Sequence, residues 1–271
     1  MITHNFFNDI FVIPILNVLV ALYVGLHSFG IPGAFGFAIV LLTVGIRFLL
    51  HPFFKQQIDT ARKMQDIKPH LDRLQAQHKK DPKRLQQEQL LLYKEHGLNP
   101  ASGCLFLIIQ IPIFIGLYST LNLFLQNGVG EKTVSQINAV LYSKAITISQ
   151  AIDPQFFGFN LAMTPQNAGV GFYYIIPVLT GVLQYFQAVA TTAKPAGKDI
   201  VKKPSSAKAS DDKDKKPDTA GDFQKAMNTQ MKYIFPFMIG YFAFTLPVGL
   251  SLYWNIFSLF SILQYRKVNK S

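Results

Sequence analysis

A permanent positive charge lies inside an otherwise apolar stretch of this sequence. Arg47 falls within LLTVGIRFLLHPFFK, from Leu41 to Lys55, and roughly 10 Å from the end of the predicted helix. Burying such a charge in hydrocarbon is costly unless water or polar groups reach it. No Asp or Glu lies in the segments that we expect to span a membrane. The chemistry on offer is therefore electrostatic attraction of carboxylates or polar backbone.

Polar side chains recur at helical spacing in the apolar segments, which places them on helix faces. The members of these faces are Thr43, Arg47 and His51; Gln110; Tyr173, Pro177, Thr180, Gln184, Gln187 and Thr191; and Trp254, Asn255, Ser258, Ser261 and Tyr265. Two structural readings compete with a functional one. The arginine can snorkel to the cytoplasmic interface, and the other side chains can form interhelical hydrogen bonds of about 0.6 kcal/mol each. Several polar faces beside one uncompensated cation favour a hydrated, positively charged groove that opens to the cytoplasm.

Composition places these faces in a membrane protein. The chain is 49% hydrophobic and 15% charged, against about 25% charged residues in an average soluble domain. Apolar runs at 10–46, 97–130, 169–193 and 233–265 are each long enough to cross a hydrocarbon core of about 30 Å. The alternative is a soluble helical protein with apolar core helices. We predict an all-α polytopic membrane protein.

The positive charges predict the orientation of the chain. No Lys or Arg precedes Arg47, whereas the segments 55–102 and 191–232 each hold ten of them. The intervening loop has only Lys132 and Lys144. By the positive-inside rule, the two basic segments and the C-terminus are cytoplasmic, and the sparse loop lies outside. A basic cytoplasmic face can also meet anionic lipid or ribosomal RNA.

The expected architecture has five transmembrane helices around the groove, a cytoplasmic helical hairpin and an N-terminal amphipathic helix at the outer interface. The segments are the interfacial helix 1–30, the first span 31–54, the hairpin 55–102, the second span 103–127, the outer loop 128–169, the third span 170–191, a disordered linker 192–232, the fourth span 233–247, the fifth span 248–266 and the tail 267–271. Residues 6–30 could instead form a sixth span.

Local signals support the hairpin and the last two spans. Asp81 suits an N-cap and Pro82 the first helical position of the second hairpin helix. Leucines at helical spacing can join the two helices along an apolar seam; they are Leu71, Leu74, Leu85 and Leu92. The fourth span, with about fourteen residues, reaches only about 21 Å, which implies local thinning of the bilayer.

The sequence contains no pattern typical of catalysis or metal binding. Cys104 is the one cysteine and the six histidines are scattered, so neither an internal disulfide nor a multi-cysteine metal site is expected. No glycine-rich phosphate loop is present. We expect no enzyme activity, no cofactor and no metal ion. A small-solute or ion transporter that uses the same polar faces is the main alternative, although no inverted repeat is evident.

Four stretches resemble the YidC/Oxa/Alb family of membrane protein insertases. They are GIRFLLHPFFKQQ, LLLYKEHGLNPASGCLFLIIQIPIFIGLYSTL, YYIIPVLTGVLQYFQ and FPFMIGYFAFTLPVGLSLYWNIFSLFSILQ. The resemblance covers most of Phe6–Tyr265 and is most specific across Arg47–Leu121. It implies a five-helix core and a hydrophilic groove closed to the outside. It also implies insertion of newly made membrane proteins without hydrolysis.

The resemblance assigns roles to some of these residues. Arg47 is the groove arginine, Thr43 and Trp254 contact substrate, and Gln110 and Gln187 line the groove. Together with the polar faces, the expected groove set is Arg47, Thr43, Gln110, Gln184, Gln187, Trp254, Asn255 and Ser258. Many members have Asn where this chain has Ser258, and we expect no large extracytoplasmic domain.

The same resemblance suggests partners and a location. We expect nascent membrane proteins and the lipid bilayer as partners, beside the Sec translocon and the ribosome, and no specific DNA. The expected location is the bacterial cell (inner) membrane, as a multi-pass protein with an extracytoplasmic N-terminus.

Overall fold

The computed structural model describes residues 4–78, 81–98, 102–125, 131–149, 152–169, 171–191 and 230–268. Most of these residues are helical. The elements are two π-helical turns, η1 (Asn8–Val12) and η4 (Gln230–Ile234); two 3-10 turns, η2 (Lys144–Ile146) and η3 (Gly171–Tyr174); the helices α1 (Ile13–Ser28), α2 (Ala34–Leu49), α3 (His51–Asp66), α4 (Lys68–Gln77), α5 (Pro82–Glu95), α6 (Ser102–Leu125), α7 (Glu131–Asn138), α8 (Ile175–Thr191), α10 (Phe235–Thr245) and α11 (Val248–Val268); and the strands β1 (Gln155–Phe156) and β2 (Phe159–Asn160).

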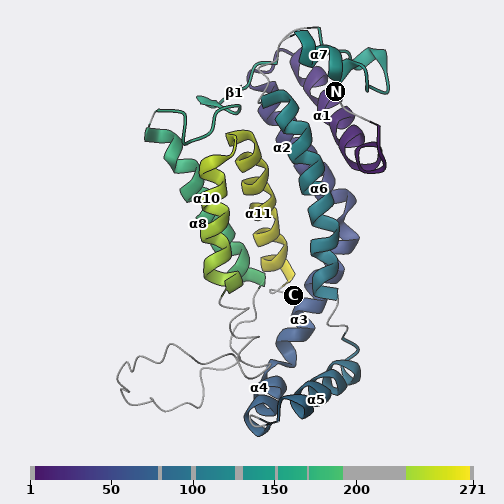
Figure 1. Ribbon diagram of the computed structural model, residues 1–271, viewed down its shortest axis with the longest axis vertical. Coiled ribbons are helices and arrows are strands. Elements are labelled where there is room, and N and C mark those ends of the chain that lie inside the picture. The colour runs from purple at the N-terminus through teal and green to yellow at the C-terminus, as the bar shows by residue number, and fades with distance from the viewer. Residues whose placement is uncertain are drawn as a thin grey trace.

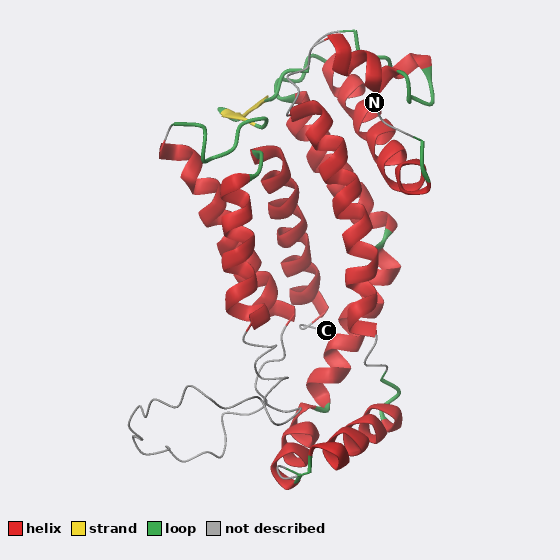
Figure 2. Cartoon of the chain, in the orientation of Figure 1, coloured by secondary structure: helices red, strands yellow, loops and turns green. Residues whose placement is uncertain are grey.

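The long helices form two groups (Figure 1). α8, α10 and α11 lie on one side, and α2 and α6 on the other. α11 packs against both α8 and α2, so it joins the two groups. α3, α4 and α5 extend beyond one end of the bundle, whereas α1, α7 and the β1–β2 hairpin lie toward the opposite end (Figure 2). The predominantly helical fold predicted from the sequence is confirmed.

Length and composition identify helices that can cross a membrane. Within the described ranges these are Asn8–Ser28 and Gly171–Ala190, and the bent pair Ala34–Leu49 and His51–Met64 is a third if it forms one span. A shorter apolar stretch, Gln110–Phe124, lies in α6. These helices support a membrane-integral protein, and the count of five spans stays a prediction. Asn8–Ser28 lies in the segment for which the sequence left a sixth span open.

The first predicted span, 31–54, is not one straight helix. α2 ends at Leu49, and α3 begins at His51 with its axis turned by 64°. Pro52 has no N–H to donate and its ring clashes with the carbonyl four residues earlier, so a straight helix cannot continue through it. The predicted polar face that started at Thr43 therefore ends at Arg47, and His51 is exposed beyond the bend.

The helical hairpin that was predicted to be cytoplasmic has the predicted turn and an additional break. The Asp81 side chain accepts a hydrogen bond from the Arg84 N–H at 3.1 Å, and Pro82 opens α5. The first arm is divided at Ile67 into α3 and α4, and Pro69 lies in the first turn of α4, which begins at Lys68. A small apolar core joins the arms; its members are Ile67, Leu71 and Leu98, with Met64, Leu92 and Tyr93 packed against them. Leu71 and Leu92 thus lie in the apolar contact between the two arms, as predicted.

The remaining boundaries differ from the prediction by a few residues. α10 ends at Thr245 and α11 begins at Val248, so the chain reverses at the predicted Leu-Pro-Val-Gly turn. α11 continues to Val268 rather than to 266. The predicted linker lies outside the described residues except for 230–232, and the tail is described only to 268.

The loop between α6 and α8 has more structure than its weak sequence signals indicated. It contains α7 and the antiparallel β1–β2 hairpin, in which Phe156 pairs with Phe159. The Asn160 N–H donates to the Tyr173 hydroxyl at 2.7 Å, which ties the hairpin to the start of the α8 segment.

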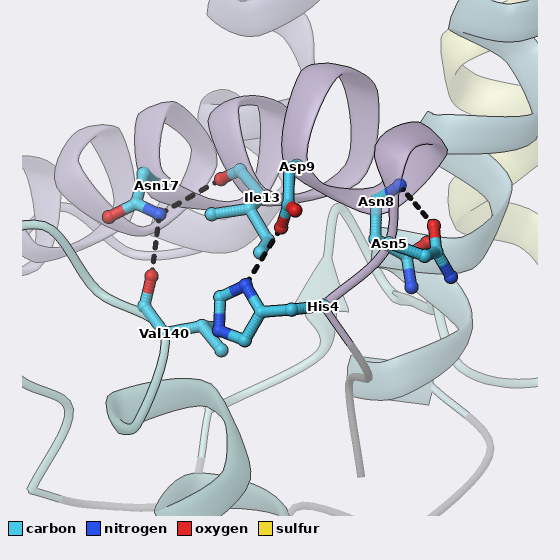
Figure 3. A network of polar contacts seen from close by, with 7 residues as sticks. All are labelled: His4, Asn5, Asn8, Asp9, Ile13, Asn17 and Val140. Atoms are coloured by element: carbon cyan, nitrogen blue, oxygen red, sulfur yellow. Dashed lines mark hydrogen bonds and ion pairs between the residues drawn. The ribbon is translucent and has the colours of Figure 1, made fainter.

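Asn17 fastens the same loop to α1 (Figure 3). Its Nδ2 donates to the carbonyls of Ile13 and Val140 at 2.9 and 3.0 Å, and its Oδ1 accepts from the Tyr142 N–H at 2.7 Å. The side chain is buried. An asparagine inside an apolar helix is therefore satisfied by loop backbone, and α1 and the loop hold each other in place.

α8 and α10 cross closely through two glycines. A Cβ at Gly240 would lie 3.3 Å from the Pro177 carbonyl oxygen and 3.5 Å from the Gly181 Cα. A Cβ at Gly181 would lie 3.6 Å from the Pro236 carbonyl oxygen. Each helix thus carries proline and glycine four residues apart at the crossing. Small residues let helix backbones approach closely in a membrane.

Gly240→Leu should separate these helices and lower the thermal stability of the protein. Overpacking of this kind typically costs about 1–3 kcal/mol. The measurement is the unfolding temperature of the protein in nanodiscs. Gly45→Leu is the matched control, because a Cβ at Gly45 has no neighbour within 4 Å. Equal unfolding temperatures for the two variants would contradict the close crossing.

Candidate functional site

Buried polar side chains gather where α11 meets α8 and α2. Their members are Thr43 and Arg47 on α2, Thr180 and Gln184 on α8, and Ser251, Asn255, Ser258 and Ser261 on α11. On α11 these side chains recur at spacings of four and three, so they share one helix face. We call this region the polar seam.

The Arg47 guanidinium is bound by α11. Nη2 donates to the Phe257 carbonyl at 2.8 Å and to the Ser261 hydroxyl, and Nη1 donates to the Gln264 amide oxygen at 3.0 Å. The guanidinium carbon lies 4.2 Å from the centre of the Phe54 ring and 3.9 Å from that of Phe257. Aromatic faces attract a desolvated cation by about 2 kcal/mol. Oxygen atoms and rings together replace the water that the charge loses.

This environment differs from the expected hydrated and unpaired arginine. Arg47 is 4% exposed, and Nε is its one donor without a hydrogen-bond partner among the described residues. The partners of the guanidinium lie on the neighbouring helix α11. The arginine was expected to be unpaired because the predicted spans contain no carboxylate. In the structure, the neutral oxygens of a carbonyl, a hydroxyl and an amide compensate its charge. The structure therefore shows this part of the seam closed.

A second set of contacts joins α8 to α11. The Ser258 hydroxyl donates to Gln184 Oε1 at 2.8 Å, and both side chains are buried. Thr180 and Thr43 instead donate to carbonyls of their own helices, at Ile176 and Ile39. The seam is thus held across helices by few hydrogen bonds, and several hydroxyls are satisfied locally.

α6 reaches the same helix from the other side. Gln110 Nε2 donates to the Tyr253 hydroxyl at 2.8 Å. One turn along α6, Phe114 stacks on Trp254 with ring centres 5.2 Å apart and an interplanar angle of 19°. Tyr253 is buried, so its hydroxyl needs this partner.

Some buried polar atoms have no partner in the described part of the chain. They are Ser251 Oγ, Asn255 Oδ1 and Gln187 Oε1 around the seam, besides the Arg47 Nε. Buried polar groups are nearly always hydrogen-bonded. Asn255 Oδ1 and Gln187 Oε1 are acceptors, so a ligand that supplies N–H donors would satisfy them.

The structure brings most of the predicted set onto α11. Arg47, Gln110 and Gln184 bond to this helix, and Trp254, Asn255 and Ser258 belong to it. Thr43 donates within α2, and the side-chain oxygens of Gln187 and Asn255 have no partner among the residues that the structure describes. Sequence reasoning missed Gln264, Tyr253, Phe54 and Phe257. Gln264 follows Ser261 by three residues, so the same helical spacing could have identified it.

The arrangement supplies one cation and several hydrogen-bonding groups. Among the residues with described positions, no group of three or more His, Cys, Asp or Glu side chains could hold a metal ion. The seam therefore offers hydrogen-bonding groups rather than metal ligands, since a guanidinium only donates hydrogen bonds, whereas amides and hydroxyls both donate and accept them.

These features define a helical membrane protein with a cationic polar seam between its helices. The sequence profile of the family described as "60Kd inner membrane protein" matches residues 26–271, so the chain belongs to this family. It is the YidC/Oxa/Alb family that the sequence resembles. Membership supports the expectation that the chain is not an enzyme.

Three relatives illustrate the similarity. The chain is 30% identical to "Membrane protein insertase YidC" of Alkalihalophilus pseudofirmus over 97% of this chain and 81% of the relative. It is 31% identical to "Inner membrane protein ALBINO3, chloroplastic" of Arabidopsis thaliana over 93% of this chain and 50% of the relative. For the YidC of Helicobacter pylori the values are 29%, 88% and 33%. The chain thus spans half or less of the latter two relatives.

The YidC relatives and the apolar helices support a location in the bacterial inner membrane.

Gln264→Glu should raise the unfolding temperature. The Arg47 guanidinium already donates to the neutral amide oxygen of Gln264, and a carboxylate in its place would add the attraction of opposite charges, which is strong in a buried site of low dielectric constant. Gln264→Leu, which removes the acceptor, should lower it. In an Arg47→Leu background, Gln264→Glu should lose its benefit. An unfolding temperature that does not respond to Gln264→Glu would contradict the pairing.

Proposed function

We propose that the chain is a membrane protein insertase that captures nascent membrane proteins at the polar seam. The observation that carries the proposal is the buried Arg47, whose partners on α11 are a carbonyl, a hydroxyl and an amide oxygen. A polypeptide entering the membrane offers these same groups, and carboxylates as well. The printed names of YidC relatives, "Membrane protein insertase", agree with this function.

Capture would proceed by exchange of partners. The polar flank of a nascent segment displaces Ser261 and Gln264 from Arg47, which opens the seam toward the cytoplasm and lets water enter with the substrate. Asn255 Oδ1 and Gln187 Oε1 accept N–H groups of the flank, which has not yet formed a helix. Each such contact lowers the cost of holding unpaired backbone in the membrane.

Two parts of the fold would assist the transfer. The cytoplasmic hairpin of α3, α4 and α5 docks the arriving segment. α10 has 11 residues and reaches only about 16 Å, so the bilayer thins around it and shortens the path of the polar flank. The hydrophobic segment then moves between the helices into lipid, and burial of its apolar surface drives the step. No nucleotide is needed.

The proposed setting is a multi-pass protein whose basic segments and C-terminus face the cytoplasm. It works alone or beside the Sec translocon, and receives substrates from the ribosome. The basic cytoplasmic segments supply the charge that favours both ribosomal RNA and anionic lipid.

The contacts of Asn17 support an interfacial position for α1. Asn17 lies in the middle of the helical run Asn8–Ser28 and bonds the irregular backbone of Val140 and Tyr142. If this run spanned the bilayer, loop backbone would lie near the membrane centre, where irregular segments facing lipid are not tolerated. We therefore propose that α1 lies at the outer surface with the loop.

Arg47→Ala should impair the insertion of substrates with acidic outer tails, because the cation that attracts them is lost. Arg47→Lys should largely support insertion. The assay is protease protection of a substrate inserted into proteoliposomes. Lys144→Ala removes one positive charge from the exposed outer loop and should insert normally. Equal insertion by wild type, Arg47→Ala and Arg47→Lys would refute charge capture.

Stability and capture can be separated with the same assay. Gln264→Glu is expected to be more stable than wild type, yet it should insert more slowly because its carboxylate competes with the substrate for Arg47. Insertion at an unchanged rate in this variant would contradict the exchange step.

The position of α1 can be tested with single cysteines in a Cys104→Ser background. Asn5→Cys and Ser28→Cys lie near the two ends of the helical run and are exposed. Both should react with a membrane-impermeant maleimide added outside intact cells. Reaction from outside at one end only would show that the run spans the membrane.

A further inference from the structure

The β1–β2 hairpin exposes an aromatic ring on a strained backbone. Phe156 pairs with Phe159, which leaves Phe157 and Gly158 as the two turn residues. Their φ angles are 48° and 83°, and Phe157 is the one non-glycine residue with positive φ in the described ranges. A two-residue turn with both φ values positive favours Asn-Gly or Gly-Gly, because a larger side chain is strained there.

The folded chain buries little of the Phe157 side chain, although its ring lies 4.7 Å, centre to centre, from the ring of Phe156. The residue is 79% exposed, so its ring buries little apolar surface within the protein. The neighbouring Phe156, in contrast, packs its ring against α2. The Phe156 ring lies on Gly36, where a Cβ would come within 2.2 Å of the ring atom Cδ2. A phenylalanine that is both strained and exposed needs an apolar environment outside the chain, since strain that persists usually serves a function.

The position of the ring indicates what that environment is. Phe157 lies 6.0 Å, centre to centre, from the Phe37 ring in the first turn of α2. Leu41 follows Phe37 by one helical turn and is 44% exposed, and Phe48 is 71% exposed. The exposed apolar side of α2 is lipid-facing in a membrane-integral protein. The hairpin that carries Phe157 lies near the end of α2 that is farthest from α3, α4 and α5 (Figure 1).

We propose that Phe157 is a membrane anchor of the outer loop and inserts its ring into the outer leaflet. The occupant of this surface is the boundary between lipid headgroups and acyl chains, where aromatic side chains are favoured. The wedge of Phe156 on Gly36 sets the depth of the hairpin, and the ring of Phe157 holds the hairpin against the bilayer. The anchor does not depend on the insertase function.

A tryptophan probe tests the contact directly. Trp254 is the one tryptophan of the chain, so Phe157→Trp is made in a Trp254→Phe background. The full-length protein is reconstituted into vesicles of phosphatidylcholine and phosphatidylglycerol that carry bromine on the acyl chains. We expect a blue-shifted emission and strong quenching by the brominated lipid.

The matched control is Lys144→Trp in the same background, an exposed position in the same loop, which should be quenched by aqueous iodide and not by bromine. Spin labels at Phe157→Cys and Lys144→Cys, in a Cys104→Ser background, give an independent readout. Oxygen should reach position 157 better than a water-soluble nickel chelate. Emission at position 157 that matches position 144 would overturn the proposal. Protection at position 157 that requires an added membrane protein would overturn it too, and would identify a protein-docking surface.

Discussion

The folded arrangement depends on how one cation is accommodated when none of its partners among the described residues is a carboxylate. Arg47 projects from α2 toward α11, and three oxygen atoms of that helix, with two aromatic faces, compensate its charge. α11 must therefore stay within reach of α2, although it also packs against α8. An apolar residue at position 47 would remove the need for this alignment. The charge sets the distance between the two groups of helices.

In the polar seam, some buried polar side chains have hydrogen-bond partners among the described residues and others do not. Arg47, Gln110, Gln184 and Ser258 have partners across helices, whereas the buried oxygens of Asn255 and Gln187 have none in the described part of the chain. A fully satisfied network would hold the helices firmly, and an apolar interface would have nothing to offer a polar ligand. Neutral oxygens bind a guanidinium less strongly than carboxylates do. Such a seam fits the proposed capture step, which requires Arg47 to exchange its partners on α11.

Much of the fold and part of the site could be predicted from the sequence. Long apolar runs and the Asp81–Pro82 cap are local signals, so the helices and the hairpin turn were predictable. The bend at Pro52 was not predicted, because the apolar run alone indicated one span over 31–54. The partners of Arg47 depend on how α2 and α11 meet, which the sequence does not give. Gln264 and the Phe257 carbonyl were therefore missed, since only carboxylates had been considered as partners. The β1–β2 hairpin was missed because its strands have two residues each, too few to produce a period.

The glycine crossing of α8 and α10 contrasts with the polar seam. At the crossing, the backbones touch with no side chain between them, so the two helices can neither slide nor separate without losing contacts along their length. The seam beside α2 is bridged by long side chains that can rotate away from one another. Any widening of the bundle would consequently occur between α2 and α11, with α8, α10 and α11 shifting as one block. Glycines hold α8 and α10 together, whereas the contact of α2 with α11 at Arg47 can open. In the proposed insertion, a guest segment would therefore leave sideways into the lipid between α2 and α11.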